Sequence, residues 1–82
     1  MKTRWIETKP YRQNTSLINA GDAVANPEIT AYIKEKGYYP TLPVCIPEDI
    51  SGETFRVTNG GEIVRSFEDA GHKIIWVFVV NE

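Results

Sequence analysis

The chain of 82 residues contains a single cysteine, Cys45, and a single histidine, His72, two residue types that serve nucleophilic catalysis. A thiolate attacks when a neighbouring imidazole has taken its proton, and nothing in the spacing of the two residues prevents their meeting in a fold. However, Cys45 lies in an apolar stretch, where a lone cysteine usually packs as a small hydrophobic residue, and His72 follows Gly71 in a turn. We therefore expect no catalytic residues and no enzyme activity.

The sequence also contains no residue pattern typical of a metal site or a phosphate-binding loop. One cysteine and one histidine leave carboxylates to complete a metal site, and the eleven acidic residues form no calcium-loop spacing. The pairs Glu48-Asp49 and Glu68-Asp69 have the composition of turns first. Asn59-Gly60-Gly61 is rich in glycine, but we place it between two strands and not before a helix, where a phosphate would bind. We expect no metal and no cofactor.

Two groups of side chains favour a protein partner. Tyr38 and Tyr39 stand beside Pro40, and tyrosine suits a site that is apolar at one end and hydrated at the other. Residues 48–82 hold seven acids and three bases, a net charge of −4, which would attract a basic partner if the acids gather on one face. In the alternative, the tyrosines cover the core and the acids are solvated turn residues. The expected contact residues are Tyr38, Tyr39, Glu48, Asp49, Glu53, Glu62, Glu68 and Asp69.

The N-terminal segment indicates another class of protein, a single-stranded nucleic-acid binder. Residues 1–12 carry four bases and one acid, net +3, whereas residues 13–82 carry five bases and ten acids, net −5. Basic and aromatic side chains alternate in proteins that hold a phosphate backbone and stack its bases. The acidic body, with a pI of about 5.4, repels phosphate, so we rank nucleic acid below a protein partner. The alternative contact set is Lys2, Arg4, Trp5, Lys9, Tyr11 and Arg12.

Composition indicates one domain of ordinary globular material, 41% hydrophobic and 24% charged, spanning residues 1–82. The N-terminus lacks the apolar core of a signal peptide. The apolar run Ile74–Val80 is too short for a membrane-spanning helix, which needs about 20 residues. A lone cysteine excludes an internal disulfide and fits a reducing compartment. We expect a cytoplasmic protein with no membrane partner.

The clearest helix signal covers Pro27–Lys36. Asn26 can cap its start, proline fits the first helical position, and Gly37 can adopt the left-handed conformation that ends a helix. Its apolar residues form a narrow stripe, which must pack on a sheet because ten residues barely hold as a helix in water.

Alternating hydrophobicity predicts strands at residues 2–8, ended by Pro10, and at residues 41–46. Pro43 lies within the second of these and removes a ladder donor, so that strand should lie at an edge or be irregular. Residues 11–25 have the composition of a loop, with one helical turn at residues 22–25.

The C-terminal part is expected to form a hairpin and a last strand. Thr54–Thr58 alternates, Asn59-Gly60-Gly61 is a strong hairpin signal, and Glu62–Phe67 would return as the second strand. Ile74–Val80 has no polar position, which is typical of a strand buried on both faces. We expect it to insert between the N-terminal strand and the hairpin, with the helix on one face and the long loop or a partner subunit on the other.

Together these signals predict an α+β domain with a four- or five-stranded, mostly antiparallel sheet, one short helix packed on one face, and a central C-terminal strand. The function we expect is that of a small non-catalytic protein-binding module. Its size and composition are those of phage and mobile-element proteins that inhibit or regulate a host protein by occluding it. The alternative is a self-assembling homo-oligomeric subunit, for example a homodimer, because a second copy would close an apolar sheet face or edge.

Overall fold

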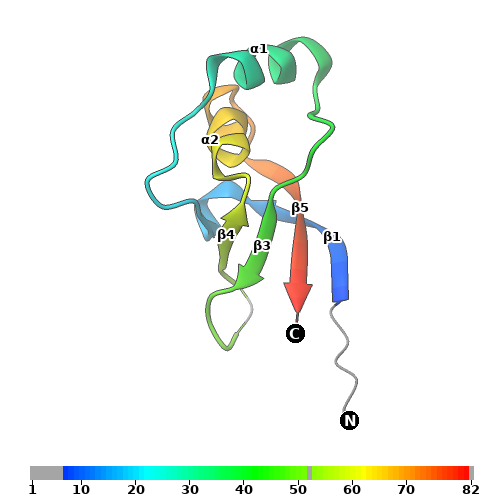
Figure 1. Cartoon of the computed structure of the whole chain (residues 1–82), viewed down its shortest axis with the longest axis vertical. Helices are drawn as coiled ribbons and strands as arrows, with labels where there is room; N and C mark the ends of the chain where they lie inside the picture. The colour runs from blue at the N-terminus through cyan, green and yellow to red at the C-terminus, as the bar shows by residue number, and fades with distance from the viewer. Residues whose placement is uncertain (1–6, 52, 82) are drawn as a thin grey trace.

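The computed structural model describes residues 7–51 and 53–81, in which five strands form one mixed sheet accompanied by two α-helices (Figure 1). The strands are β1 (Glu7–Asn14), β2 (Ile18–Asn19), β3 (Val44–Pro47), β4 (Phe55–Asn59) and β5 (Ile74–Asn81). The helices are α1 (Pro27–Lys36), α2 (Gly61–Asp69) and a short 3₁₀ helix, η1 (Thr15–Leu17). The predicted α+β class is confirmed, whereas the prediction of a single helix is wrong.

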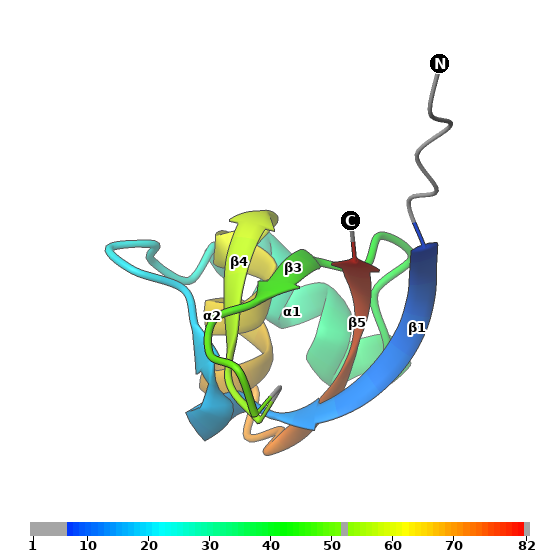
Figure 2. The ribbon, with the colours of Figure 1, turned by 90° about the horizontal axis from the view of Figure 1, so that it is seen from below.

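The strands lie in the order β1-β5-β3-β4-β2 across the sheet. β1–β5 and β3–β4 are antiparallel and form most of the ladder, while β3–β5 and β4–β2 are parallel. β1 and β2 follow one another in the chain yet lie at opposite edges, so β1 curves beneath the other strands and the sheet curls on itself (Figure 2). The rings of Tyr11 in β1 and Phe55 in β4 meet at 5.5 Å although their strands are not neighbours. The sheet therefore has an inner face, which holds the core, and an outer face.

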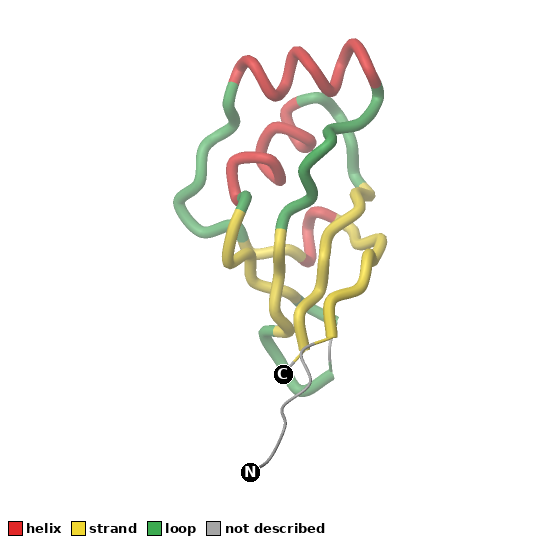
Figure 3. Tube along the Cα trace, turned by 45° about the vertical axis from the view of Figure 1, so that its right-hand side comes forward, coloured by secondary structure: helices red, strands yellow, loops and turns green. Residues whose placement is uncertain are grey.

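α1 has the predicted bounds, but it does not lie across the sheet. The side chain of Asn26 accepts a hydrogen bond from the Glu28 N–H at 2.9 Å, and Gly37 ends the helix with φ 81°. α1 packs chiefly against α2, and both helices lie at one end of the sheet (Figure 3). The buried hydroxyl of Ser66 in α2 accepts a hydrogen bond from the Asn26 N–H at 2.9 Å, which fixes the start of α1 on α2.

The predicted return strand at residues 62–67 is wrong, because this segment lies in α2. Ile63, Val64 and Phe67 are all buried, and spacings of one and four residues place them on one side of a helix. A strand would have pointed Val64 away from the other two. Asn59-Gly60-Gly61 is therefore the turn from a strand into a helix and not a hairpin turn.

Two glycines allow that turn to be tight. Gly60 has φ 91°, in the left-handed region that favours glycine. At Gly61 a Cβ would lie 2.9 Å from the Cβ of Ala23, so the connection that precedes α1 packs directly on the first turn of α2. The turn thus joins three parts of the chain: β4, α2 and the segment before α1.

β5 lies between β1 and β3, so the prediction that the last strand has neighbours on both sides is confirmed. Ile75, Val77 and Val79 are buried in the core. On the other face Ile74 and Trp76 are 52% and 50% exposed. The prediction that the long loop covers this second face is wrong, because these side chains stay half exposed among the described residues.

The strand limits predicted from prolines need correction. β1 runs through Pro10, since an edge strand tolerates a proline whose nitrogen faces away from the ladder. β3 starts after Pro43 and lies inside the sheet, but the predicted irregularity is present as a register shift between Val44 and Cys45. The first part of the predicted N-terminal strand, residues 2–6, lies outside the described residues.

The predicted loop at residues 11–25 contains the end of β1, η1 and β2. Asn14 caps η1 by accepting a hydrogen bond from the Ser16 N–H, and Ile18 is buried beside Phe55 of β4. The helical turn expected at residues 22–25 is not formed.

Cys45 lies at the centre of the core, where Ile33, Val64 and Val77 are also fully buried. Burial removes solvation from the thiolate and raises the pKa of the Cys45 thiol to about 11, from an ordinary value of 9.0. The thiol is therefore protonated at neutral pH.

We predict that Gly61→Ala destabilises the protein by about 1–3 kcal/mol, although alanine is normally the better helix residue. The reason is the 2.9 Å approach to Ala23. Urea unfolding at 25 °C measures the loss. The double variant Gly61→Ala/Ala23→Gly should recover at least about half of it, because the opposing methyl group is gone. An unchanged or raised stability of Gly61→Ala would contradict this account of the turn.

We also predict that the stability advantage of the wild type over Cys45→Ala shrinks as the pH rises from 9 to 11. The unfolded thiol ionises near pH 9, whereas the folded thiol stays protonated to about pH 11. The contribution of Cys45 is thus complete below pH 9 and declines above it, by up to about 1 kcal/mol per pH unit. Urea unfolding of both proteins at each pH gives the difference. A constant difference would show that the thiol is not desolvated.

Candidate functional site

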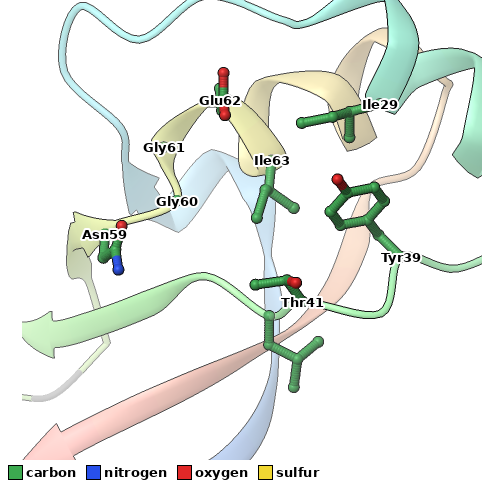
Figure 4. Close-up of a pocket in the computed structure, with 9 residues that line it drawn as sticks. Ile29, Tyr39, Thr41, Asn59, Gly60, Gly61, Glu62 and Ile63 are labelled. Atoms are coloured by element: carbon green, nitrogen blue, oxygen red, sulfur yellow. The ribbon is translucent and has the colours of Figure 1, made fainter.

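Two surfaces of the described residues have the geometry of a site: a cavity beside the start of α2, and the outer face of the sheet. The cavity has a volume of about 450 Å³ and lies between α1, the connection from α1 to β3, and the turn into α2 (Figure 4). Tyr39 and Ile63 face each other across it (Figure 4). Its polar lining residues are Tyr39, Thr41, Asn59, Gly60, Gly61 and Glu62, and its apolar ones are Ile29, Leu42 and Ile63.

The charge of the cavity does not suit a phosphate. None of its nine lining residues is a lysine or arginine, and Glu62 adds a carboxylate in the first turn of α2. A helix N-terminus attracts negative charge, and Glu62 already supplies it from the chain itself. Gly60 and Gly61 are explained by the tight turn and by the contact with Ala23.

The outer face consists of side chains on four neighbouring strands. Alternation along β5 places Ile74 and Trp76 on this face, and the residue register extends it across β1, β3 and β4. Phe78, Val80, Val44 and Ile46 are half-buried, whereas Arg12 and Arg56 are exposed. The outer face is defined as Arg12, Val44, Ile46, Arg56, Ile74, Trp76, Phe78 and Val80.

Arg12 and Trp76 form a pair on the outer face. They are directly opposite in the β1–β5 register, and the Arg12 guanidinium carbon lies 5.9 Å from the centroid of the Trp76 ring. This is the distance of a cation–π contact, which orients both side chains at little cost. Neither Arg12 nor Arg56 forms an ion pair within the described part of the chain. This pair could not be predicted from the sequence, because it depends on the register between β1 and β5.

The expected acidic contact residues are divided among three places. Glu48, Asp49 and Glu53 lie in the loop between β3 and β4, at the end of the sheet away from the helices (Figure 1). Glu62 lies beside the cavity. At the end of α2, Glu68 pairs with Arg65 at 3.1 Å, and Asp69 is exposed. The structure does not bring these acids together as one patch.

The two expected tyrosines flank Tyr32 at the end of α1. The rings of Tyr38 and Tyr39 lie 5.9 and 5.4 Å from the ring of Tyr32, in edge-to-face geometry. Hydrogen bonding to Tyr38 raises the pKa of Tyr32. Tyr38 is 54% exposed, whereas Tyr39 packs against the core and lines the cavity. The structure thus brings the tyrosines together but separates them from most of the acids.

The alternative nucleic-acid set is only partly described. Lys2, Arg4 and Trp5 lie outside the described residues, and Lys9 lies in β1. Tyr11 faces Phe55 on the inner side, while Arg12 lies on the outer face. These two neighbours therefore cannot serve one stacking surface.

The remaining chemistry is sparse among the described residues. The protonated, buried thiol of Cys45 is no nucleophile, and His72 packs edge-on against Phe67 with ring centroids 5.5 Å apart. No group of three metal-ligating side chains gathers in residues 7–51 and 53–81. Neither described helix has the length and apolar character needed to cross a membrane.

Comparison with known proteins gives a likeness of fold. No protein-family model matches the sequence, and no curated protein matches it. A solved structure that it resembles is the C-terminally truncated chromosome-partitioning protein ParB from Caulobacter crescentus, complexed with CTP-γ-S. The TM-score is 0.68 at 15% sequence identity. The match covers 87% of this chain and 43% of that one, so this chain spans less than half the length of the ParB fragment and shares its fold over that part.

Proposed function

We propose that this protein is a non-catalytic module that binds another protein through its outer face and acts as an inhibitor or regulator by occluding it. The observation that carries the proposal is Trp76, which is half exposed on β5, an internal strand of the sheet, and lies opposite Arg12 of β1. Tryptophan on an apolar surface is one of the residue types that dominate binding energies between proteins, and arginine is another. We favour the outer face over the acidic residues because the structure spreads those acids over three places.

The extent of the outer face supports this function. β1 and β5 have eight residues each, β4 has five and β3 has four, which at about 4.8 Å between strands and about 3.4 Å along them cover roughly 400 Å² of sheet. Patches of this size are the largest found on most monomers and are often functional. The apolar residues on the core side of β5 stabilise the fold because they are buried. The apolar residues on its outer side stay in contact with water and contribute no such stabilisation. A partner that covers Ile74 and Trp76 would gain the burial that the chain itself does not supply.

We do not propose nucleotide binding from the likeness to the ParB structure. That structure holds CTP-γ-S, whose triphosphate carries several negative charges. The cavity of this chain offers one carboxylate and no cationic lining residue, so a triphosphate would meet no opposite charge there. We therefore assign binding to the outer face and no ligand to the cavity.

Photo-crosslinking from defined positions tests the proposal. We predict that p-benzoylphenylalanine in place of Ile74 or Trp76 gives a discrete protein adduct in an extract of the cells that carry this protein. The same group in place of Asp69, exposed at the end of α2, should give none. Added unlabelled wild type should abolish the adduct, whereas Trp76→Glu should compete at least about tenfold less well, because hot-spot residues each contribute this much or more. Melting curves confirm that each variant is folded.

Three outcomes would overturn the protein-binding proposal. Equal adducts from Trp76 and Asp69, or none, would remove the outer face as an interface. An adduct of twice 9.3 kDa that contains only this chain would indicate self-assembly. An adduct that nuclease digests would indicate a nucleic-acid partner.

A further inference from the structure

We infer that the element of the partner that seats on the outer face is an amphipathic helix whose apolar stripe is bordered by carboxylates. This inference rests on the proposed function and names the chemistry of the partner. Three properties of the outer face lead to it: its apolar strands are internal strands of the sheet, its apolar strip has the width of one helix, and its two arginines lie on opposite sides of that strip.

The backbone of the outer face excludes an added strand. β5 and β3 carry most of its apolar side chains, and each already has a strand on both sides. Strand addition requires an edge with unpaired N–H and C=O groups. Just before β3 starts, the Phe78 N–H donates to the Pro43 carbonyl at 2.8 Å, so the β3 side of β5 is paired from Phe78 onward. A partner must therefore approach with side chains, and a helix presents a continuous stripe of them.

The width of the apolar strip matches one helix. The strip covers β5 and β3, and the arginines lie one strand further out on each side, in β1 and β4. Three inter-strand spacings separate Arg12 from Arg56, about 14 Å when measured along the curled sheet. A helix with its side chains is about 10–12 Å wide. A single helix laid along β5 and β3 would fill the strip and bring both of its margins to an arginine.

The register also sets the arginines apart along the strands. Arg12 of β1 is opposite Trp76 of β5, and Arg56 of β4 is opposite Ile46 of β3. β3 and β5 run parallel, with Val44 opposite Phe78. Ile46 is therefore at the level of Val80. Trp76 and Val80 are four residues apart, about 13 Å along a strand. On a helix that distance corresponds to roughly nine residues. The carboxylates of the partner should therefore lie on opposite borders of its stripe, about nine residues apart.

Charge distinguishes this partner from a second copy of the chain. Arg12 and Arg56 form no ion pair within the described residues, and burying them against a partner without carboxylates would leave both charges uncompensated. The eight residues that define the outer face include no carboxylate; the acid next to them along β3 is Glu48, two residues after Ile46, near Asn19, which lies opposite Arg56. Glu48 follows β3 and accepts a hydrogen bond from Asn19. Two outer faces in contact would thus bring the arginines of both copies together, with Glu48 beside Arg56 but no carboxylate among the register neighbours of Arg12.

A nucleic acid fits the outer face less well. Most of the strip is aliphatic, with Ile74, Val44, Ile46 and Val80, and such side chains neither stack on bases nor bind phosphate. Two arginines also supply few phosphate contacts for an acidic chain with a pI near 5.4.

Two designed helical peptides of 18 residues test the inference. Both carry the same leucine stripe, bordered in one by glutamates and in the other by lysines. Each is titrated into the ¹⁵N-labelled full chain, and the affinity is read from amide shifts. We expect the glutamate peptide to bind with a Kd of about 0.1 mM, at least about tenfold tighter than the lysine peptide, with shifts confined to the outer face.

Charge reversal provides the decisive comparison. Arg12→Glu/Arg56→Glu should reverse the preference and select the lysine peptide. The matched control, Lys34→Glu/Lys36→Glu, makes the same change in net charge on α1 and should keep the wild-type preference. Equal affinity for both peptides, or binding of neither at millimolar concentration, would overturn the inference. So would shifts that depend on protein concentration alone, or tighter binding of a dodecathymidine oligonucleotide.

The experiments distinguish a failure of the helix inference from a failure of the proposed function. If the peptides fail while the group placed at Trp76 still forms a competed protein adduct, a protein docks on the outer face and the helix is wrong. If the charge-reversed pair behaves as expected but no adduct forms, the outer face recognises acidic helices and the proposed cellular function is wrong.

Discussion

The turn from β4 into α2 is the constraint on which the rest of the structure depends. Gly60 takes a conformation that other residues avoid, and Gly61 leaves no room for a side chain beside Ala23. Because no loop separates the strand from the helix, α2 starts at the end of the sheet and directs Ile63, Val64 and Phe67 into the core. The segment before α1 is then held on α2: Arg65 donates to the carbonyls of Ala23 and Gly21, and Ser66 bonds to Asn26. α1 is therefore positioned by α2 and not by the sheet.

This arrangement explains why the outer face is bare. Both helices pack on each other at one end of the curled sheet, and β1 and β2 form its two edges. A chain of 82 residues has no further element among its described residues to form a third layer. β5 nevertheless keeps apolar residues on both faces, as in strands that are covered on both sides. β5 thus has the composition of a strand covered on both faces, but the fold covers only one of them. A partner on the outer face would cover the other.

Parts of the fold that depend on local chemistry could be predicted from the sequence. α1 is one, because Asn26, Pro27 and Gly37 define its ends without help from the rest of the chain. α2 could not be predicted, because Asn-Gly-Gly after an alternating strand has the same local preferences before a strand as before a helix. The burial of Ile63, Val64 and Phe67 in the core favours the helix, and it depends on distant segments. The pairing of Arg12 with Trp76 was missed for the same reason, since it depends on the β1–β5 register.

The size of the outer face limits how the protein would act. Roughly 400 Å² on one side is below the area of most stable complexes, which bury about 800 Å² per partner. Apolar burial alone would give a weak and unselective contact, since leucine-rich stripes are common on helices. Arg12 and Arg56 form no ion pair within the described residues, and they change this because they lie diagonally across the strip: a partner with carboxylates at those positions binds better than one with cations there. The cation–π contact with the Trp76 ring orients the Arg12 guanidinium before a partner binds. Selectivity would thus come from the register of four strands, which places two charges at fixed positions around an apolar centre.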